Sequence, residues 1–183
     1  MDRAAAVPPR SEVPAVAIVP VDEDVLDVLL GVAVADAEPI DVMPPVAGPP
    51  GWTDAARAAF AAHHRSRRPG LAGPHAEVTW AILADGAVVG SARLHRVGPG
   101  CLEMGVWLGR SARAHGVGTA LVPLLVAEAG RLGATTVIAE TTADNVGALA
   151  TLRRNGALLT DHPGGHVRAE LPVPPVGPLP PGG

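Results

Sequence analysis

The chain has 183 residues, of which 48% are hydrophobic, and a formal net charge of −4, as expected of one globular domain. No apolar run approaches the roughly 18 residues that a membrane helix needs, and the N-terminus lacks a secretory signal, so we expect a cytoplasmic protein without membrane contact. All 14 basic residues are Arg, which excludes a P-loop kinase and a pyridoxal-phosphate enzyme, because each requires a lysine.

The first half of the chain alternates proline-rich segments with short periodic ones. Asp22 and Thr53 each precede an apolar helical pattern and are expected to be helix N-caps. Between the two helices, residues 36–52 contain too many prolines for regular structure, so we expect a long functional loop. The expected order is a disordered lead (1–14), a strand (15–19), a helix that ends near residue 35, the loop (36–52) and a second helix (54–68).

The second half begins with a predicted antiparallel meander. Asp85-Gly86 is a typical hairpin turn between two alternating segments, and Gly98-Pro99-Gly100 leads into a third strand. The expected elements are strands at 77–83, 87–96 and 101–108, a helix at 116–132, a strand at 135–141, a helix that ends near 155, a closing hairpin at 157–171 and a proline-rich tail at 172–183.

An Arg- and Gly-rich turn joins the strand 101–108 to the helix 116–132. The start of a helix leaves backbone N–H groups unpaired at the positive end of its dipole, and Gly116 and Gly118 let a ligand approach the main chain. This pattern favours an anion site, most naturally for a pyrophosphate. A Rossmann fingerprint would need a third glycine at position 121, where the sequence has Leu.

The turn, Arg113-Ala114-His115-Gly116-Val117-Gly118, resembles the signature of the GNAT superfamily of acyl-CoA-dependent N-acetyltransferases. The segments Asp144–Leu149 and Arg153–Gly156 resemble the second motif of that family, and the likeness covers residues 15–171. It implies the GNAT fold, an α/β (α+β type) single domain in which helices flank a mixed, mostly antiparallel central sheet. It also implies direct transfer of an acetyl group from acetyl-CoA to an amine.

The same resemblance implies a binding site for acetyl-CoA as co-substrate and no metal. The single cysteine agrees with the absence of a metal, because it can form neither an internal disulfide nor a Cys-based zinc cluster. The pantetheine arm is expected along the strand edge at Val106 and Leu108, and Asn145 is expected near the thioester. The pyrophosphate is expected on the backbone amides of Arg113, Ala114, His115, Gly116, Val117, Gly118 and Thr119.

Glu103 is the candidate base that takes the proton of the amine. Alternation puts Glu103, Gly105 and Trp107 on one face of the strand 101–108. The alternative is a solvated strand carboxylate without a catalytic role. Many family members place a Tyr seven residues after the motif Asn, but here that position is Leu152, so the proton of the leaving thiol comes from water, from the substrate or from another group such as His115.

The acceptor is inferred from charge, because residues 1–52 hold nine of the 18 acidic residues and only Arg3 and Arg10 as cations. An acidic wall containing Glu38 and Asp41 beside Trp52 favours a small cationic amine such as an aminoglycoside antibiotic, for example of the kasugamycin type. Nucleic acid is not expected as a partner, since the basic patch and interleaved aromatics are missing. The alternatives are a ribosomal-protein-type N-terminal acetyltransferase and a CoA-binding module without catalysis; a homodimer through the closing strands is compatible with the sequence.

Overall fold

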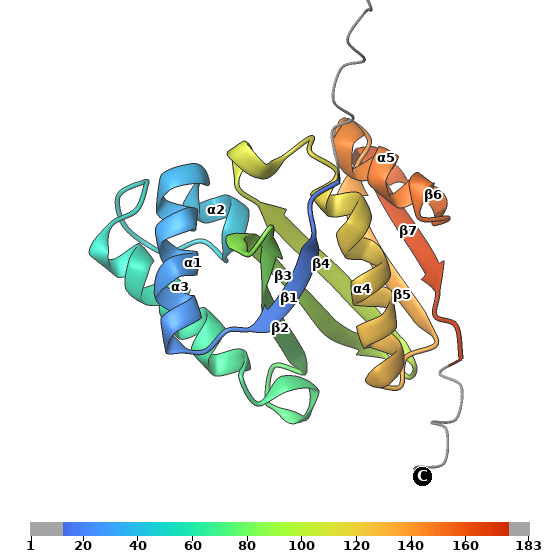
Figure 1. Ribbon diagram of the computed structural model, residues 1–183, viewed down its shortest axis with the longest axis horizontal. Coiled ribbons are helices and arrows are strands. Elements are labelled where there is room, and N and C mark those ends of the chain that lie inside the picture. The colour runs from blue at the N-terminus through green and yellow to red at the C-terminus, as the bar shows by residue number, and fades with distance from the viewer. Residues whose placement is uncertain (1–12, 176–183) are drawn as a thin grey trace, which may run out of the picture.

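The computed structural model describes residues 13–175, which form one α/β unit with helices on both faces of a seven-stranded sheet (Figure 1). Most of the predicted disordered lead and of the proline-rich tail lies outside the described residues. The strands are β1 (Val16–Pro20), β2 (Glu77–Ala84), β3 (Ala87–Gly98), β4 (Cys101–Leu108), β5 (Thr136–Thr142), β6 (Leu158–His162) and β7 (His166–Pro172). The helices are α1 (Glu23–Asp36), α2 (Pro39–Val42), α3 (Asp54–Arg67), α4 (Val117–Arg131) and α5 (Val146–Arg154).

The predicted helix caps are confirmed. Asp22 Oδ1 accepts a hydrogen bond from the N–H of Val25 at 2.9 Å, and Thr53 Oγ1 accepts one from the N–H of Ala56 at 3.1 Å. The prediction of a loop without regular structure over 36–52 is wrong at α2, where Pro39 occupies the first helical turn. Proline is tolerated there because its fixed φ suits a helix start and its missing N–H has no intrahelical partner to lose.

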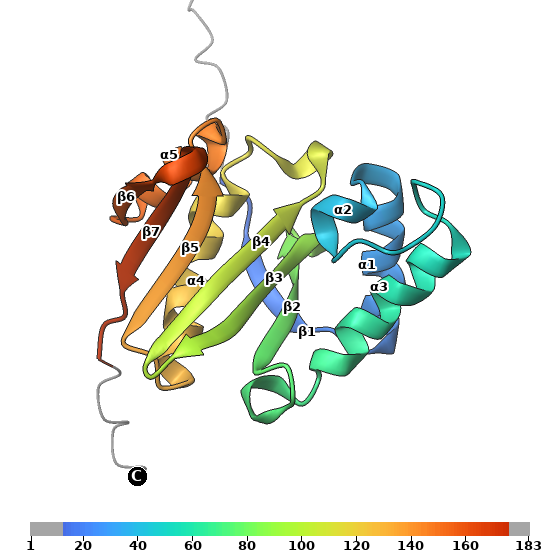
Figure 2. The same ribbon diagram turned by 180° about the vertical axis from the view of Figure 1, so that it is seen from behind.

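The sheet has the order β1-β2-β3-β4-β5-β7-β6, and β4 and β5 are its only parallel neighbours among the described strands. These two strands pair only from Cys101 and Thr136 to Glu103 and Ile138. Beyond that point they diverge, as the yellow-green β4 and the orange β5 do in Figure 2. The second half of β4 therefore has a free edge toward β5.

Two hydrophobic clusters cover the two faces of the sheet. On one face α4 and α5 pack on β2 to β5, with Leu121 and Leu125 fully buried; on the other, α1 and α3 pack around Leu29 and Phe60. The alternation along β4 assigns Leu102 to the α4 side and Trp107 to the α3 side. None of the helices between residues 13 and 175 is long and apolar enough to cross a membrane.

Helix α4 contains a proline, Pro123, whose ring nitrogen cannot donate to the carbonyl of Thr119 one turn earlier. The side chain of Asn155, just after α5, supplies the missing donor: its Nδ2 lies 3.2 Å from the carbonyl oxygen of Thr119 and 3.0 Å from that of Thr151. Asn155 thus ties the end of α5 to the first turn of α4.

Candidate functional site

The first turn of α4 has no side-chain cap. Its N-cap residue is Gly116, with a φ of +82°, and Ala114, two residues earlier, also adopts a left-handed conformation, with a φ of +65°. Within residues 13–175, no acceptor bonds the backbone N–H groups of residues 114–119, and the first helical bond joins the N–H of Ala120 to the carbonyl of Gly116. A row of unpaired amides at a helix start is chemically suited to an anion.

Two contacts hold the turn in place. Arg113 donates from Nε to the carbonyl of Leu108, at the end of β4, over 2.9 Å. Asp36, at the end of α1, accepts from the N–H and the hydroxyl of Ser111 at 2.8 and 2.6 Å, and these bonds lower the pKa of its carboxyl group, with the Ser111 hydroxyl contributing most. The guanidinium of Arg113 and the imidazole of His115 are exposed.

The free edge of β4 leads from this turn toward Glu103. Val106 is 43% exposed, and Leu108 is half-buried against the α4-side cluster. Asn145 is the N-cap of α5, where its Oδ1 accepts from the N–H of Ala148 at 3.1 Å. The sequence-predicted residues of the co-substrate site thus belong to the free half of β4, the turn before α4 and the start of α5, which lie at one end of the molecule in Figure 2.

A polar cavity of about 610 Å³ lies on the α3 side of the sheet, over β2, β3 and β4. Its wall includes the α2 segment with Met43, and Gly105 and Trp107 of β4. The titratable residues that line it are Asp41, His63, Arg67, His75, Glu77, Arg93 and His95.

Ion pairs connect the cavity to Glu103. Glu77, whose side chain is only 9% exposed, accepts from Arg67 Nε at 2.7 Å and from Arg93 Nη1 at 3.2 Å. The other guanidinium nitrogen of Arg93, Nη2, donates to Glu103 Oε1 at 2.6 Å. Sequence reasoning found Glu103 but missed Arg67, Glu77 and Arg93.

Two adjacent histidines lie beside this network. Burial lowers the pKa of His63 to about 4, with a further contribution from the Arg67 charge, so its imidazole is neutral at neutral pH. Burial also lowers the pKa of His64 to about 3; its Nδ1 lies 3.3 Å from Thr79 Oγ1. The Nε2 atom of His64 is the one buried side-chain polar atom without a hydrogen-bond partner in the part of the chain that the structure describes.

The three residues predicted for the acceptor do not come together. Asp41 lines the cavity, whereas Glu38 is exposed and does not contribute to its wall. Trp52 donates from its indole N–H to the carbonyl of Ala37 at 2.9 Å, and its ring packs edge-on against Phe60 in the α1–α3 cluster. Its environment is that of a packing residue.

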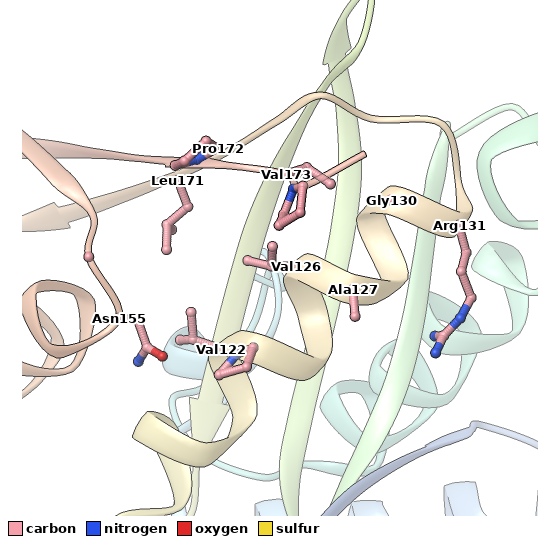
Figure 3. A pocket seen from close by; sticks show the side chains of 12 residues that line it. Val122, Val126, Ala127, Gly130, Arg131, Asn155, Leu171, Pro172 and Val173 are labelled. Atoms are coloured by element: carbon pink, nitrogen blue, oxygen red, sulfur yellow. The ribbon is translucent and has the colours of Figure 1, made fainter. Parts of the chain in front are cut away.

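A second cavity, of about 690 Å³, lies between α4, the end of α5 and the chain that follows β7 (Figure 3). Apolar side chains from α4 and β7, including Val122, Val126 and Leu171, form most of its wall, and Asn155 lies at its rim. None of the sequence-predicted site residues lines it.

Comparisons with known proteins agree with this geometry. The model of a family described as acetyltransferase (GNAT) domain matches residues 16–158. The comparison with curated proteins found no match. Among solved structures, RimJ of Mycobacterium smegmatis in complex with CoA-disulfide is 17% identical with a TM-score of 0.71, covering 86% of this chain and 81% of that one.

Two further solved structures show the same fold. The N-acetyltransferase PseH of Campylobacter jejuni in complex with acetyl coenzyme A is 11% identical, with a TM-score of 0.63, and covers 86% of this chain and 99% of its own. RimL, a ribosomal L7/L12 alpha-N-protein acetyltransferase, is 13% identical with a TM-score of 0.62, covering 86% of this chain and 93% of its own. At these identities the likeness is one of fold.

Proposed function

Because the chain belongs to the acetyltransferase (GNAT) domain family and is an N-acetyltransferase, we propose that it acetylates a small cationic amine, such as an aminoglycoside of the kasugamycin type, with acetyl-CoA as donor. The observation that carries the proposal is the position of β4. The second half of β4 has a free edge that leads to the uncapped start of α4. The first half of β4 carries Glu103, which is paired with Arg93 beside the polar cavity.

The residues around the start of α4 fit acetyl-CoA. The unpaired amides of residues 114–119 can receive the pyrophosphate, and the left-handed Gly116 keeps the main chain accessible there. A Cβ at Gly118 would lie 3.5 Å from the methyl group of Thr151, an ordinary contact, so the second position of the motif can accept Ala as well as Gly. When bound, acetyl-CoA supplies the activated acetyl group.

Glu103 takes the proton of the acceptor amine in this proposal, directly or through a water molecule. The amine has to be neutral when it attacks, so a group beside the cavity must remove its proton. Because the sequence contains no Tyr, the proton that the leaving thiol needs comes from water, from the acceptor or from another group such as His115.

The preference for a cationic acceptor is supported by Asp41. Glu77 forms ion pairs with Arg67 and Arg93 in the cavity, whereas no ion pair within the described residues includes Asp41. A carboxylate without a countercharge at the rim of a cavity attracts and orients a cation.

A peptide N-terminus is the second candidate acceptor. The fold likeness to RimJ and to RimL, which is named an alpha-N-protein acetyltransferase, favours it. In this alternative the cavity holds the first residues of a protein chain.

A thiol-release assay with acetyl-CoA decides between the candidates. Kasugamycin and other aminoglycosides, spermidine and short peptides with a free N-terminus serve as acceptors. Release with the cationic small molecules supports the first proposal and release with peptides alone supports the second. Binding of CoA without thiol release from any amine contradicts both and favours a non-catalytic CoA-binding module.

A matched pair of variants tests the role of Asp41. We expect Asp41→Asn to raise the KM for a cationic acceptor by about threefold to tenfold, because a single rim carboxylate contributes roughly 1 kcal/mol. Glu38→Gln removes a neighbouring acidic charge that does not line the cavity and should leave this KM unchanged. Equal effects of the two substitutions would mean that Asp41 has no specific contact with the acceptor.

A further inference from the structure

Four charged side chains form a continuous row beside the polar cavity: Arg67 from α3, Glu77 from β2, Arg93 from β3 and Glu103 from β4. Arg93 is central, because its two terminal nitrogens bond different carboxylates, Nη1 that of Glu77 and Nη2 that of Glu103. Glu77 is in turn fixed by Arg67 over 2.7 Å. The orientation of Glu103 therefore depends on a chain of contacts that begins on a different element.

Gly105 makes room for this arrangement. It is the cross-strand partner of Arg93, and a Cβ built on Gly105 would lie 2.6 Å from Arg93 Nε and 3.0 Å from its Cγ. The Arg93 side chain thus lies flat over β4 at the one position of that strand without a side chain. An alanine at 105 would displace the Arg93 side chain while leaving every charge in place.

We propose that Arg93 is a positioning residue that holds Glu103 for proton transfer from the acceptor amine, and that Glu77 is the permanent countercharge that keeps Arg93 in place. This inference rests on the proposed function. An arginine suits the role because its planar guanidinium can bond two carboxylates at once, whereas a lysine ammonium is a single point charge.

The second carboxylate has a specific use during the reaction. When Glu103 takes a proton from the acceptor ammonium, an N–H bond breaks, an O–H bond forms on Glu103 and the electron pair stays on the amine nitrogen. Glu103 then becomes neutral, and its attraction for Arg93 weakens. A half-buried guanidinium left without a partner would oppose the proton transfer. Because Glu77 still carries its charge, Arg93 keeps a partner throughout.

Three variants test the inference through steady-state kinetics of thiol release. We expect Arg93→Gln and Gly105→Ala each to lower kcat by about tenfold or more, since misplacing a general base forfeits much of its contribution, while the KM for acetyl-CoA stays within about twofold. Arg93→Lys should recover part of the loss. The control is Arg96→Gln, which removes an exposed arginine of the same strand that forms no ion pair within the described residues, and it should keep the wild-type kcat.

A double-mutant cycle separates positioning from a purely structural role. If Arg93 acts through Glu103, Arg93→Gln should lower kcat no further in a Glu103→Gln background. Full kcat in Gly105→Ala and Arg93→Gln, or equal losses with and without Glu103, would overturn the inference while leaving the proposed function intact. A wild-type protein that releases thiol with no amine would refute both.

Discussion

Glu103 is the residue on which the proposed chemistry depends. We expect Glu103→Gln to lower kcat by about 100-fold, since a positioned general base typically contributes a factor of that order, with little change in acetyl-CoA affinity. Glu140→Gln is the matched control: Glu140 is also a strand carboxylate near an arginine, 3.6 Å from Arg168, but Arg168, unlike the Arg93 that bonds Glu103, does not line the cavity. Thiol-release kinetics and acetyl-CoA titration measure the two quantities; unchanged turnover in Glu103→Gln would remove it from the mechanism.

Gly116 and Gly133 provide a second comparison at this scale, because both have a φ of +82° at opposite ends of α4. Alanine at either position costs about 1 kcal/mol of backbone strain, so the two variants should lose similar stability. Only Gly116→Ala distorts the amides proposed to bind the pyrophosphate, and we expect it to raise the KM for acetyl-CoA by about tenfold. The same KM increase in Gly133→Ala would show that the effect comes from the helix as a whole.

At the scale of elements, Pro123 and Asn155 form a compensating pair between α4 and α5. Asn155→Ala should lower the free energy of unfolding by about 1–2 kcal/mol, because it leaves the carbonyl of Thr119 without a donor. Pro123→Ala restores the backbone N–H that can bond this carbonyl, so Asn155→Ala should cost less in that background. Urea unfolding of the two single variants and the double variant gives the coupling energy, and strictly additive effects would contradict the pairing.

Local features of the helices and strands could be predicted from the sequence, whereas the pairing of Pro123 with Asn155 could not. Helix caps, the Asp85-Gly86 hairpin and the end of α4 at Gly133 depend on local residues, and the structure confirms them. The resemblance pointed to the Asn155-Gly156 motif but did not explain why an Asn stands there. The structure explains it by the hydrogen bond from Asn155 to α4, a contact between two helices that the residues next to Asn155 do not specify.

The ion-pair row could not be predicted for a similar reason. A bulge between Ile82 and Leu83 shifts the register of β2 against β3 by one residue, so that Glu77 pairs with His95 instead of Leu94. Only with this shift does Glu77 share a sheet face with Arg93 and Glu103. Alternation within β4 was sufficient to place Glu103 but carries no information about the neighbouring strand.

At the scale of the whole molecule, the sheet is covered on both faces, but the two faces are filled differently. The α4 side is filled by one continuous apolar cluster, whereas on the α3 side the apolar cluster around Phe60 adjoins the polar cavity. His63 and His64 lie at this boundary, one in the wall of the cavity and the other 4.8 Å from the ring of Phe60. The stability of the fold is therefore linked to the protonation of two histidines.

The sign of this linkage follows from the lowered pKa values. The unfolded chain binds protons at both histidines near pH 6.5, whereas the folded chain binds them only near pH 4 at His63 and pH 3 at His64. Stability is thus fully present above about pH 6.5 and falls as the pH drops toward 4, by at most about 1.4 kcal/mol per pH unit for each histidine. Glu23, whose pKa is lowered from 4.5 to about 2, begins to contribute only near pH 4.5, so the histidines dominate the pH dependence between pH 6.5 and 4.5.

Replacing His64 tests directly whether the two buried histidines cause this pH dependence of stability. We expect His64→Leu to reduce the pH dependence of the free energy of unfolding between pH 6.5 and 4.5 by about half, because one of the two titrating groups is gone. At pH 7 the cost should stay within about 1 kcal/mol. The variant gives up the 3.3 Å contact with Thr79 and the ring contacts with Phe60 and His63, but it keeps an apolar side chain beside Phe60 and removes an Nε2 atom that has no partner. Urea unfolding across this range measures both quantities, with His162→Gln, an exposed histidine of the β6–β7 hairpin, as control. A His64→Leu variant with the full wild-type pH dependence would mean that the acid sensitivity arises elsewhere in the fold.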